Sequence, residues 1–214
     1  MLAALLDLVL PVRCGGCGVP GTPWCRECAR ALNDPPAQVH VRVDPGVPVW
    51  ALGAYSGARR NAVVAAKERG RRDLAPPLGL AVAVAVARLR RWGELPAGPL
   101  IVVPAPTRAR AARARGGDPV TRMARCAASH DPSLHVHPML VTGARVRDSV
   151  GLSASQRQDN LAGRISIRAD SLPRSLPLLV IDDIVTTGAT TREAVRVLRK
   201  AGFRTSGILV IARA

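Results

Sequence analysis

Two adjacent carboxylates, Asp182 and Asp183, stand near the end of an apolar run in the stretch VIDDIVTTGATT (180–191). The run LLVID (178–182) predicts a buried strand, and the segment ATTREAVRVLRKAG (189–202) has the apolar spacing of a helix. We therefore interpret the residues between them as the turn from the carboxyl end of a parallel strand into a helix. Open α/β sheets bind their ligands at such turns.

This turn has the chemistry of a phosphate site. Its backbone N–H groups can converge on an anion, and the following helix adds the positive end of its dipole. The hydroxyls of Thr186, Thr187 and Thr190 supply further donors. Asp182 and Asp183 come just before the turn, where they can reach the vicinal hydroxyls of a ribose whose 5′-phosphate the turn holds. A P-loop and a dinucleotide fingerprint are both excluded here, because the turn has neither glycine frame.

Four of the five cysteines have the spacing of metal ligands, Cys14-x2-Cys17-x7-Cys25-x2-Cys28. Each C-x-x-C pair can present two sulfurs to one tetrahedral zinc, which is structural because four protein sulfurs leave no open position. Two disulfides in a secreted protein are the alternative. The short spacer predicts a small knuckle without a recognition helix of its own. The fifth cysteine, Cys126, is expected to be a buried core thiol.

Composition sets broad limits on the protein. A chain of 214 residues with 48% hydrophobic content fits one ordinary domain plus a small appendage. The net charge of +16 implies attraction to anions such as nucleotides, phosphosugars or nucleic acid, although an arginine-rich compositional bias explains it equally well. The apolar N-terminus, interrupted by Asp7 and ended by Pro11, is too short to span a membrane. We expect a short amphipathic helix there, no stable membrane insertion and a cytoplasmic location.

Strand and helix patterns alternate along the rest of the chain. This alternation predicts an α/β fold with a parallel sheet covered on both faces. The expected division is an N-terminal helix and zinc knuckle over 1–34, a linker with one short strand over 35–48, and the α/β domain over 49–214. Strands are expected at 49–55, 100–103, 178–182 and 207–212, and helices at 59–69, 77–92, 119–129 and 190–201.

The stretch VIDDIVTTGATT resembles the phosphoribosyl pyrophosphate motif of type I phosphoribosyltransferases, from the hydrophobic strand through the acidic pair to the helix. The resemblance implies that Asp182 and Asp183 are catalytic residues that contact the ribose hydroxyls. It also implies that the turn cradles the 5′-phosphate through Thr186, Thr187, Gly188, Ala189 and Thr190.

With its four-cysteine module, the whole chain resembles the ComF family, also called GntX-like or amidophosphoribosyltransferase-like, which is linked to DNA uptake in naturally competent bacteria. Segments 55–70, 102–119 and 148–163 are similar to that family as well. The chain departs from it where many members read R-G-F-N-Q, since it has R-G-G-D-P at 115–119, and at Ser149, where a Gln is frequent. Both departures bear on the identity of the acceptor.

The diphosphate of phosphoribosyl pyrophosphate must be neutralised as it leaves. A loop stiffened by prolines at 104–106 precedes Arg108 and Arg110, which could supply this charge. Lys67, one of two lysines in the chain, is a further candidate. The alternative for each of these cations is a solvated helix face. A magnesium ion bridging diphosphate and ribose is expected, brought mainly by the ligand.

Two functional hypotheses follow. The first is an enzyme that transfers phosphoribose from its diphosphate donor to a nitrogen acceptor, through an oxocarbenium-like state in which Asp182 and Asp183 hold the ribose. The second is a non-catalytic competence factor that binds single-stranded DNA and uses the fold as a scaffold responsive to a nucleotide or to phosphoribosyl pyrophosphate. With only 2% aromatic residues, such DNA binding should be made mostly to phosphates and depend steeply on salt.

Overall fold

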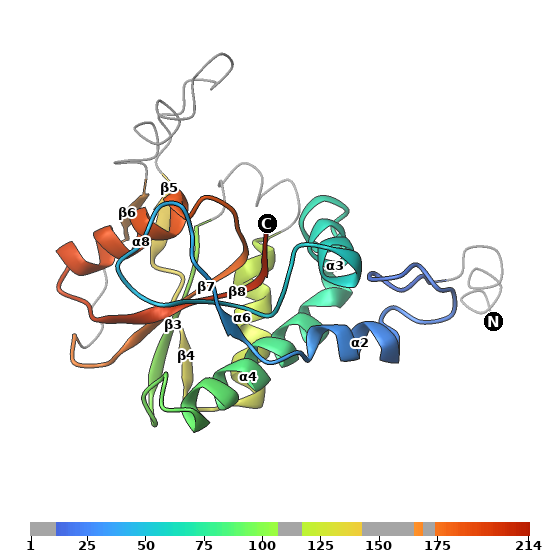
Figure 1. The fold of residues 1–214 in the computed structure, drawn as a ribbon, viewed down its shortest axis with the longest axis horizontal. Coiled ribbons are helices and arrows are strands. Elements are labelled where there is room, and N and C mark those ends of the chain that lie inside the picture. The colour runs from blue at the N-terminus through green and yellow to red at the C-terminus, as the bar shows by residue number, and fades with distance from the viewer. Residues whose placement is uncertain (1–11, 107–116, 143–164, 169–173) are drawn as a thin grey trace, which may run out of the picture.

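A mainly parallel six-stranded sheet lies at the centre of the molecule (Figure 1). The structure is a computed structural model that describes residues 12–106, 117–142, 165–168 and 174–214. The helices in these ranges are α2 (Arg26–Leu32), α3 (Gly57–Glu68), the 3-10 helix η1 (Arg72–Leu74), α4 (Ala75–Arg91), α6 (Pro119–His130) and α8 (Ala189–Lys200). The strands are β1 (Ala37–Gln38), β2 (Val49–Ala51), β3 (Leu100–Pro104), β4 (Leu134–Val136), β5 (Leu140–Thr142), β6 (Ile165–Ile167), β7 (Leu178–Val185) and β8 (Thr205–Arg213).

The order of the strands determines where a ligand can bind. It is β1-β2-β8-β7-β3-β4, in which β1 pairs antiparallel with β2 and the other neighbours are parallel. From β3 the chain passes through α6 to β4 at one edge, and from β7 it passes through α8 to β8 in the opposite direction. The winding therefore reverses between β3 and β7. Open α/β sheets bind ligands outside the carboxyl ends of the strands at such a switch point.

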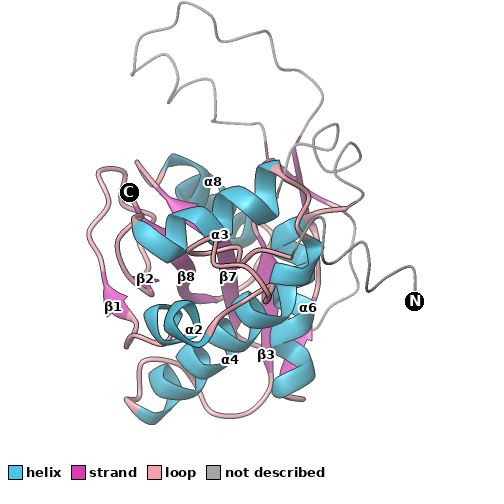
Figure 2. Cartoon of the chain, turned by 90° about the vertical axis from the view of Figure 1, so that its right-hand side faces the viewer, coloured by secondary structure: helices cyan, strands magenta, loops and turns pink. Residues whose placement is uncertain are grey.

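Helices cover both faces of the sheet. On one side, α3, α4 and α6 pack over Leu179 and Ile181 of β7, and on the other side α8 packs over Leu178 and Val180. This division follows from the strand itself, because successive side chains point to opposite faces. Figure 2 shows α2, α3 and α4 together in front of the sheet. The helix α2, which carries Cys28, thus packs against α3 and α4.

The predicted α/β class with a mainly parallel sheet is confirmed, and each strand and helix predicted between residues 49 and 214 has a counterpart. The strand predicted over 178–182 continues to Val185, because β8 keeps pairing with it beyond the acid pair. Five short elements were not predicted, namely α2, η1, β4, β5 and β6. The helix expected near the N-terminus lies outside the described residues. Within the described ranges, no helix has the length and apolarity needed to cross a membrane.

The sequence predicts a buried core thiol at Cys126, but this residue is only half-buried. It lies on α6 where that helix approaches α4 at Gly79. A Cβ built on Gly79 would come within 2.4 Å of the Cys126 Cβ. The thiol thus packs at the helix contact while part of its surface remains open, because α6 is an outer helix.

Candidate functional site

The acid pair lies where β7 extends beyond the end of its neighbour β3. Pairing with β3 ends at Pro104 and Ile181, whereas pairing with β8 continues to Val185. Asp182 and Asp183 therefore sit beside the carboxyl end of β3, at the switch point of the sheet. The strand runs three residues further than the sequence predicts, and both carboxylates belong to it rather than to the turn.

Each carboxylate has its own environment. Asp183 is buried and faces α3, where Lys67 Nζ lies 2.9 Å from one of its carboxylate oxygens and 3.1 Å from the other. Asp182 is half-buried, and its Oδ1 accepts a hydrogen bond of 2.8 Å from the backbone N–H of Asp183. The fold thus joins Lys67 to the acid pair across 116 residues of sequence.

The charges of these three residues are coupled. Burial, together with the adjacent carboxylate of Asp183, raises the pKa of Asp182 well above the usual aspartate range. Burial acts to lower the pKa of Lys67, but the attraction of Asp183 outweighs it and raises that pKa. One cation therefore faces two carboxyl groups, and a polar ligand with hydroxyl donors suits the carboxylate that Lys67 does not contact.

The turn after β7 is held in one conformation from two sides. Gly188 has a φ of 88°, and a Cβ there would lie 2.5 Å from the carbonyl oxygen of Val43, so that only glycine fits. The backbone N–H of Val43 donates to Thr187 O at 2.8 Å. The hydroxyl of Thr191 donates to Gly188 O, also at 2.8 Å. These contacts fix the direction in which the N-terminus of α8 points.

This geometry can bind one phosphate group. The first N–H groups of a helix have no acceptor within the helix, and the helix dipole favours an anion there. Ala189 and Thr190 open α8, and the hydroxyl-bearing Thr186 just before them is exposed. The turn follows the acid pair directly, so a ligand with a phosphate and vicinal hydroxyls can engage both.

Two predicted diphosphate contacts and two unpredicted supports of the turn remain to be located. Arg108 and Arg110 lie outside the described residues. Val43 and Thr191, which fix the turn, were not predicted as part of the site. The alternating valines at 39, 41 and 43 are a weak signal for a half-buried extended segment. This segment lies within the predicted linker.

The four predicted metal ligands come together. The sulfurs of Cys14, Cys17, Cys25 and Cys28 all lie within 4.8 Å of one another, and those of Cys17 and Cys25 are 3.6 Å apart. Four sulfurs placed 2.3 Å from a tetrahedral zinc are about 3.8 Å from each other. The cluster therefore has the donor set and the size of a structural zinc site. The helix α2 starts directly after Cys25 and carries Cys28, so the knuckle does include a short helix.

Backbone N–H groups prepare this cluster for a cation. Gly16 and Cys25 each donate to the Cys14 sulfur at 3.4 Å. Burial opposes ionisation of Cys14, but hydrogen bonds from the backbone of Cys17, Cys25 and Gly16, together with the Cys28 side chain, lower its pKa to about 6. Burial and the neighbouring sulfurs raise the pKa of Cys28. The raised pKa means that ionising Cys28 costs free energy in the metal-free cluster. A bound metal ion would offset this cost, because it deprotonates its thiol ligands.

Comparisons with known proteins give only remote likenesses. No protein-family model and no curated protein matches the sequence. A hypoxanthine phosphoribosyltransferase from Staphylococcus aureus is 16% identical with a TM-score of 0.35, over 67% of this chain and 63% of that one. UMP synthase from Leishmania donovani is 15% identical with a TM-score of 0.38, over 87% of this chain and 31% of that one. Adenine phosphoribosyltransferase from Saccharomyces cerevisiae is 12% identical with a TM-score of 0.37, over 89% and 90%.

The chain spans less than two thirds of the first two of these proteins. All three TM-scores lie below 0.5. The functional conclusion therefore depends on the chemistry of the chain's own acid pair, turn and cysteine cluster.

Proposed function

We propose that this protein binds magnesium phosphoribosyl pyrophosphate and transfers phosphoribose to a nitrogen acceptor, as a ComF-like member of the type I phosphoribosyltransferases. One observation carries the proposal. At the switch point between β3 and β7, a carboxyl pair contacted by Lys67 is followed directly by a glycine turn that opens α8. A ribose 5-phosphate group has hydroxyls for the first feature and a phosphate for the second.

The residues of the site then take distinct roles. The turn from Thr186 through Thr187, Gly188 and Ala189 to Thr190 holds the 5′-phosphate, and the acid pair holds the ribose hydroxyls. The bond from ribose C1 to the diphosphate breaks with its electron pair on the leaving oxygen. A bond forms between C1 and the acceptor nitrogen, which loses a proton.

The carboxylates lie close enough to the ribose to stabilise positive charge on the ring in the transition state. Lys67, Arg108 and Arg110 are proposed to contact the diphosphate. Magnesium, when bound with the donor, neutralises diphosphate charge. The cysteine cluster takes no part in the bond changes, because four sulfur ligands leave zinc no open position. The ComF resemblance supports a link to DNA uptake or to nucleotide metabolism as part of this proposal.

Thermal unfolding with a panel of ligands tests this proposal. A ligand of the native state at about 100 times its Kd stabilises by roughly 2.7 kcal/mol, which for a chain of this size raises Tm by roughly 5–10 °C. We expect this shift with magnesium plus phosphoribosyl pyrophosphate, and smaller shifts with ribose 5-phosphate or pyrophosphate alone. The Asp182→Asn, Asp183→Asn double variant should lose it. An intact fold with no shift for the complete donor would contradict the proposal.

One basic surface of the protein favours a second function, the binding of nucleic acid. A hollow of about 400 Å³ lies between the segment Asp44–Gly46 and the outer face of α8. Three arginines and a lysine line it, and they suit a phosphate backbone better than an apolar partner. The cations are Arg192, Arg196, Arg199 and Lys200.

In this alternative the protein binds single-stranded DNA without catalysis. Its affinity should fall linearly with salt on logarithmic axes, and the Arg192→Ala, Arg199→Ala double variant should lower the slope by roughly 1–2. Absence of binding at low salt would remove this alternative and leave the charge as a compositional bias.

A further inference from the structure

The metal knuckle, residues 12–28, is attached to the helix that carries Lys67. Asn61 on α3 donates to Gly16 O at 2.6 Å, between the two cysteines of the first pair. Gly15 lies so close to Leu74 that a Cβ would come within 2.6 Å of its side chain. Six residues along the same helix, Lys67 contacts Asp183. The knuckle and the acid pair therefore contact the same helix.

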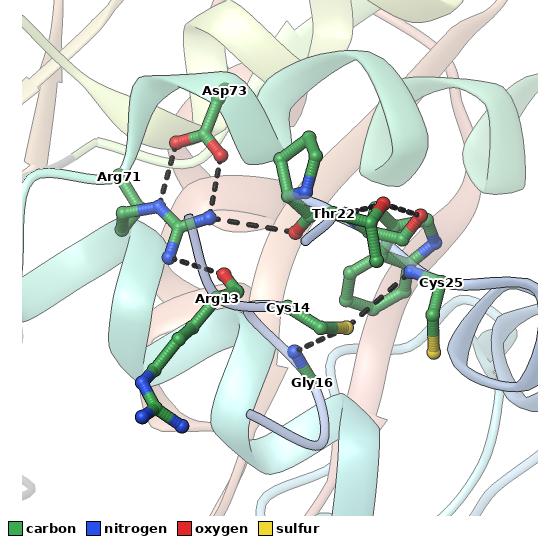
Figure 3. A network of polar contacts seen from close by, with 9 residues as sticks. Arg13, Cys14, Gly16, Thr22, Cys25, Arg71 and Asp73 are labelled. Atoms are coloured by element: carbon green, nitrogen blue, oxygen red, sulfur yellow. Dashed lines mark hydrogen bonds and ion pairs between the residues drawn. The ribbon is translucent and has the colours of Figure 1, made fainter. Parts of the chain in front are cut away.

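Arg71 contacts the knuckle at two points (Figure 3). Its Nη1 donates to Arg13 O at 3.0 Å and its Nη2 donates to Pro23 O at 3.4 Å. These carbonyls lie just before Cys14 and Cys25, so one guanidinium contacts both halves of the cysteine loop. Two further bonds, of 2.8 and 2.6 Å, join Arg71 to the Asp73 carboxylate, which fixes the plane of the group.

The backbone of Arg71 is also tied to α3. Its N–H donates to Ala65 O at 3.1 Å, two residues before Lys67. The side chains of Lys67, Arg71 and Asp183 all line one small cavity of about 20 Å³. These contacts thus form a continuous path from the cysteine loop through Arg71 and the end of α3 to the acid pair.

We propose that Arg71 is a positioning residue that couples the metal knuckle to the candidate sugar-phosphate site. The bound metal fixes the carbonyl groups of Arg13 and Pro23, and these carbonyls fix the Arg71 side chain. Arg71 in turn fixes the end of α3 that places Lys67 beside Asp183. Filling of the four-cysteine site is then required for full donor affinity. The part that concerns the donor rests on the proposed function, whereas the part that concerns Lys67 does not.

The physical reason is the dependence of the knuckle on its metal. Small four-ligand zinc modules fold because metal binding provides their folding free energy. When the metal is lost, the loop that presents Arg13 O and Pro23 O opens, and Arg71 loses both acceptors. The last turn of α3 then loses the attachment that Arg71 provides to the knuckle, and helix ends with fewer such contacts open locally at lower cost. A separate module over 1–34 predicts the opposite result, in which the acid pair does not respond to the metal.

The lysine content of the chain provides a direct test, because Lys67 and Lys200 are its only lysines. Lysine-selective isotope labelling gives two side-chain NMR signals, which Lys67→Arg and Lys200→Arg assign. Removing the metal from the full-length protein with a chelator should shift the Lys67 signal toward that of a free lysine and leave Lys200 unchanged. The variant Arg71→Ala should do the same while the protein still holds its metal.

A matched control is next in the sequence. Arg72→Ala removes the same charge from an exposed arginine whose side chain makes no hydrogen bond or ion pair within the described part of the chain, and both lysine signals should stay in place. If Arg71→Ala fails to fold, Arg71→Lys keeps the charge but places all its donors on one nitrogen, so that it cannot reach both carbonyls as the guanidinium does. It should give an intermediate Lys67 shift, beside a third lysine signal from the new residue. A Lys67 signal unchanged by metal removal from a folded protein, or by Arg71→Ala, overturns the proposal.

Calorimetry with magnesium phosphoribosyl pyrophosphate adds the binding readout. Arg71→Ala, with metal content unchanged, should raise Kd about tenfold, the loss expected when a charged contact is no longer held in place. Arg72→Ala should leave Kd unchanged. Failure of the wild-type protein to bind the donor would count against the proposed function alone, since the lysine signals still test the coupling. Equal Kd for wild type and Arg71→Ala would count against the coupling alone.

Discussion

The metal knuckle and the candidate sugar-phosphate site are built in opposite ways. The knuckle takes its four ligands from 15 consecutive residues, Cys14 to Cys28, and brings them together around one point. The sugar-phosphate site takes Lys67 from α3, the acid pair from β7 and the support of its turn from the segment at Val43, so it exists only when the sheet is complete. A local site depends on its ion, whereas a site assembled across the sheet depends on the whole fold.

Removing a buried metal ligand should have the largest effect. Cys28→Ser replaces a buried thiolate with a weak ligand, and the metal content should fall from about one per chain to near zero. Structural zinc contributes about 10–16 kcal/mol to folding in isolated modules, so Tm should drop sharply. Metal analysis and calorimetric unfolding measure both. Cys126→Ser is the matched control, since this thiol lies outside the cluster, and full metal content in Cys28→Ser would contradict the assignment.

The next largest effect should come from the phosphate turn. Gly188→Ala forces a side chain into a left-handed conformation and against the Val43 carbonyl, which should lower the free energy of unfolding by about 2–4 kcal/mol. Gly93→Ala has a similar positive φ with no atom within 4 Å, so only the conformational cost of about 1–2 kcal/mol should remain. Urea denaturation measures both. Equal losses would show that the Val43 contact does not constrain the turn.

The acid pair should show a smaller effect that depends on pH. The pKa of Asp182 is raised in the folded protein above its unfolded value near 3.9, so the native state binds more protons between these two values. Stability attributable to this residue therefore falls as pH rises from about 4 through the raised pKa. Asp182→Asn should thus have a higher Tm than wild type at neutral pH, and the difference should vanish toward pH 4. A difference independent of pH would exclude this titration as the cause.

The smallest effect should come from the surface of the metal module. Glu27 and Arg30 form an ion pair on α2 with both side chains more than 70% exposed. Arg30→Ala should change stability by less than about 0.5 kcal/mol and leave the metal content unchanged. Denaturant titration beside metal analysis checks this. Loss of the metal in Arg30→Ala would mean that surface charge, rather than the four sulfurs alone, holds the module together.

The two sites also differ in how much of them can be predicted from sequence. The spacing of the cysteines predicts all four ligands, because the geometry of two C-x-x-C pairs is local. The acid pair and the Thr-Gly turn are predicted for the same reason. The Lys67–Asp183 contact, the support of Gly188 by Val43 and the role of Arg71 are set by tertiary packing between distant segments, which no local pattern encodes. For the same reason β7 extends to Val185, since β8 rather than its own sequence decides where it ends.

A structure of the protein with magnesium and phosphoribosyl pyrophosphate tests the central claim most directly. The proposed function predicts the 5′-phosphate on the N–H groups and hydroxyls of Thr186 to Thr190, with the ribose hydroxyls at Asp182 and Asp183. A ligand seated instead in the basic hollow along Arg192 and Arg199, with the acid pair untouched, would contradict it.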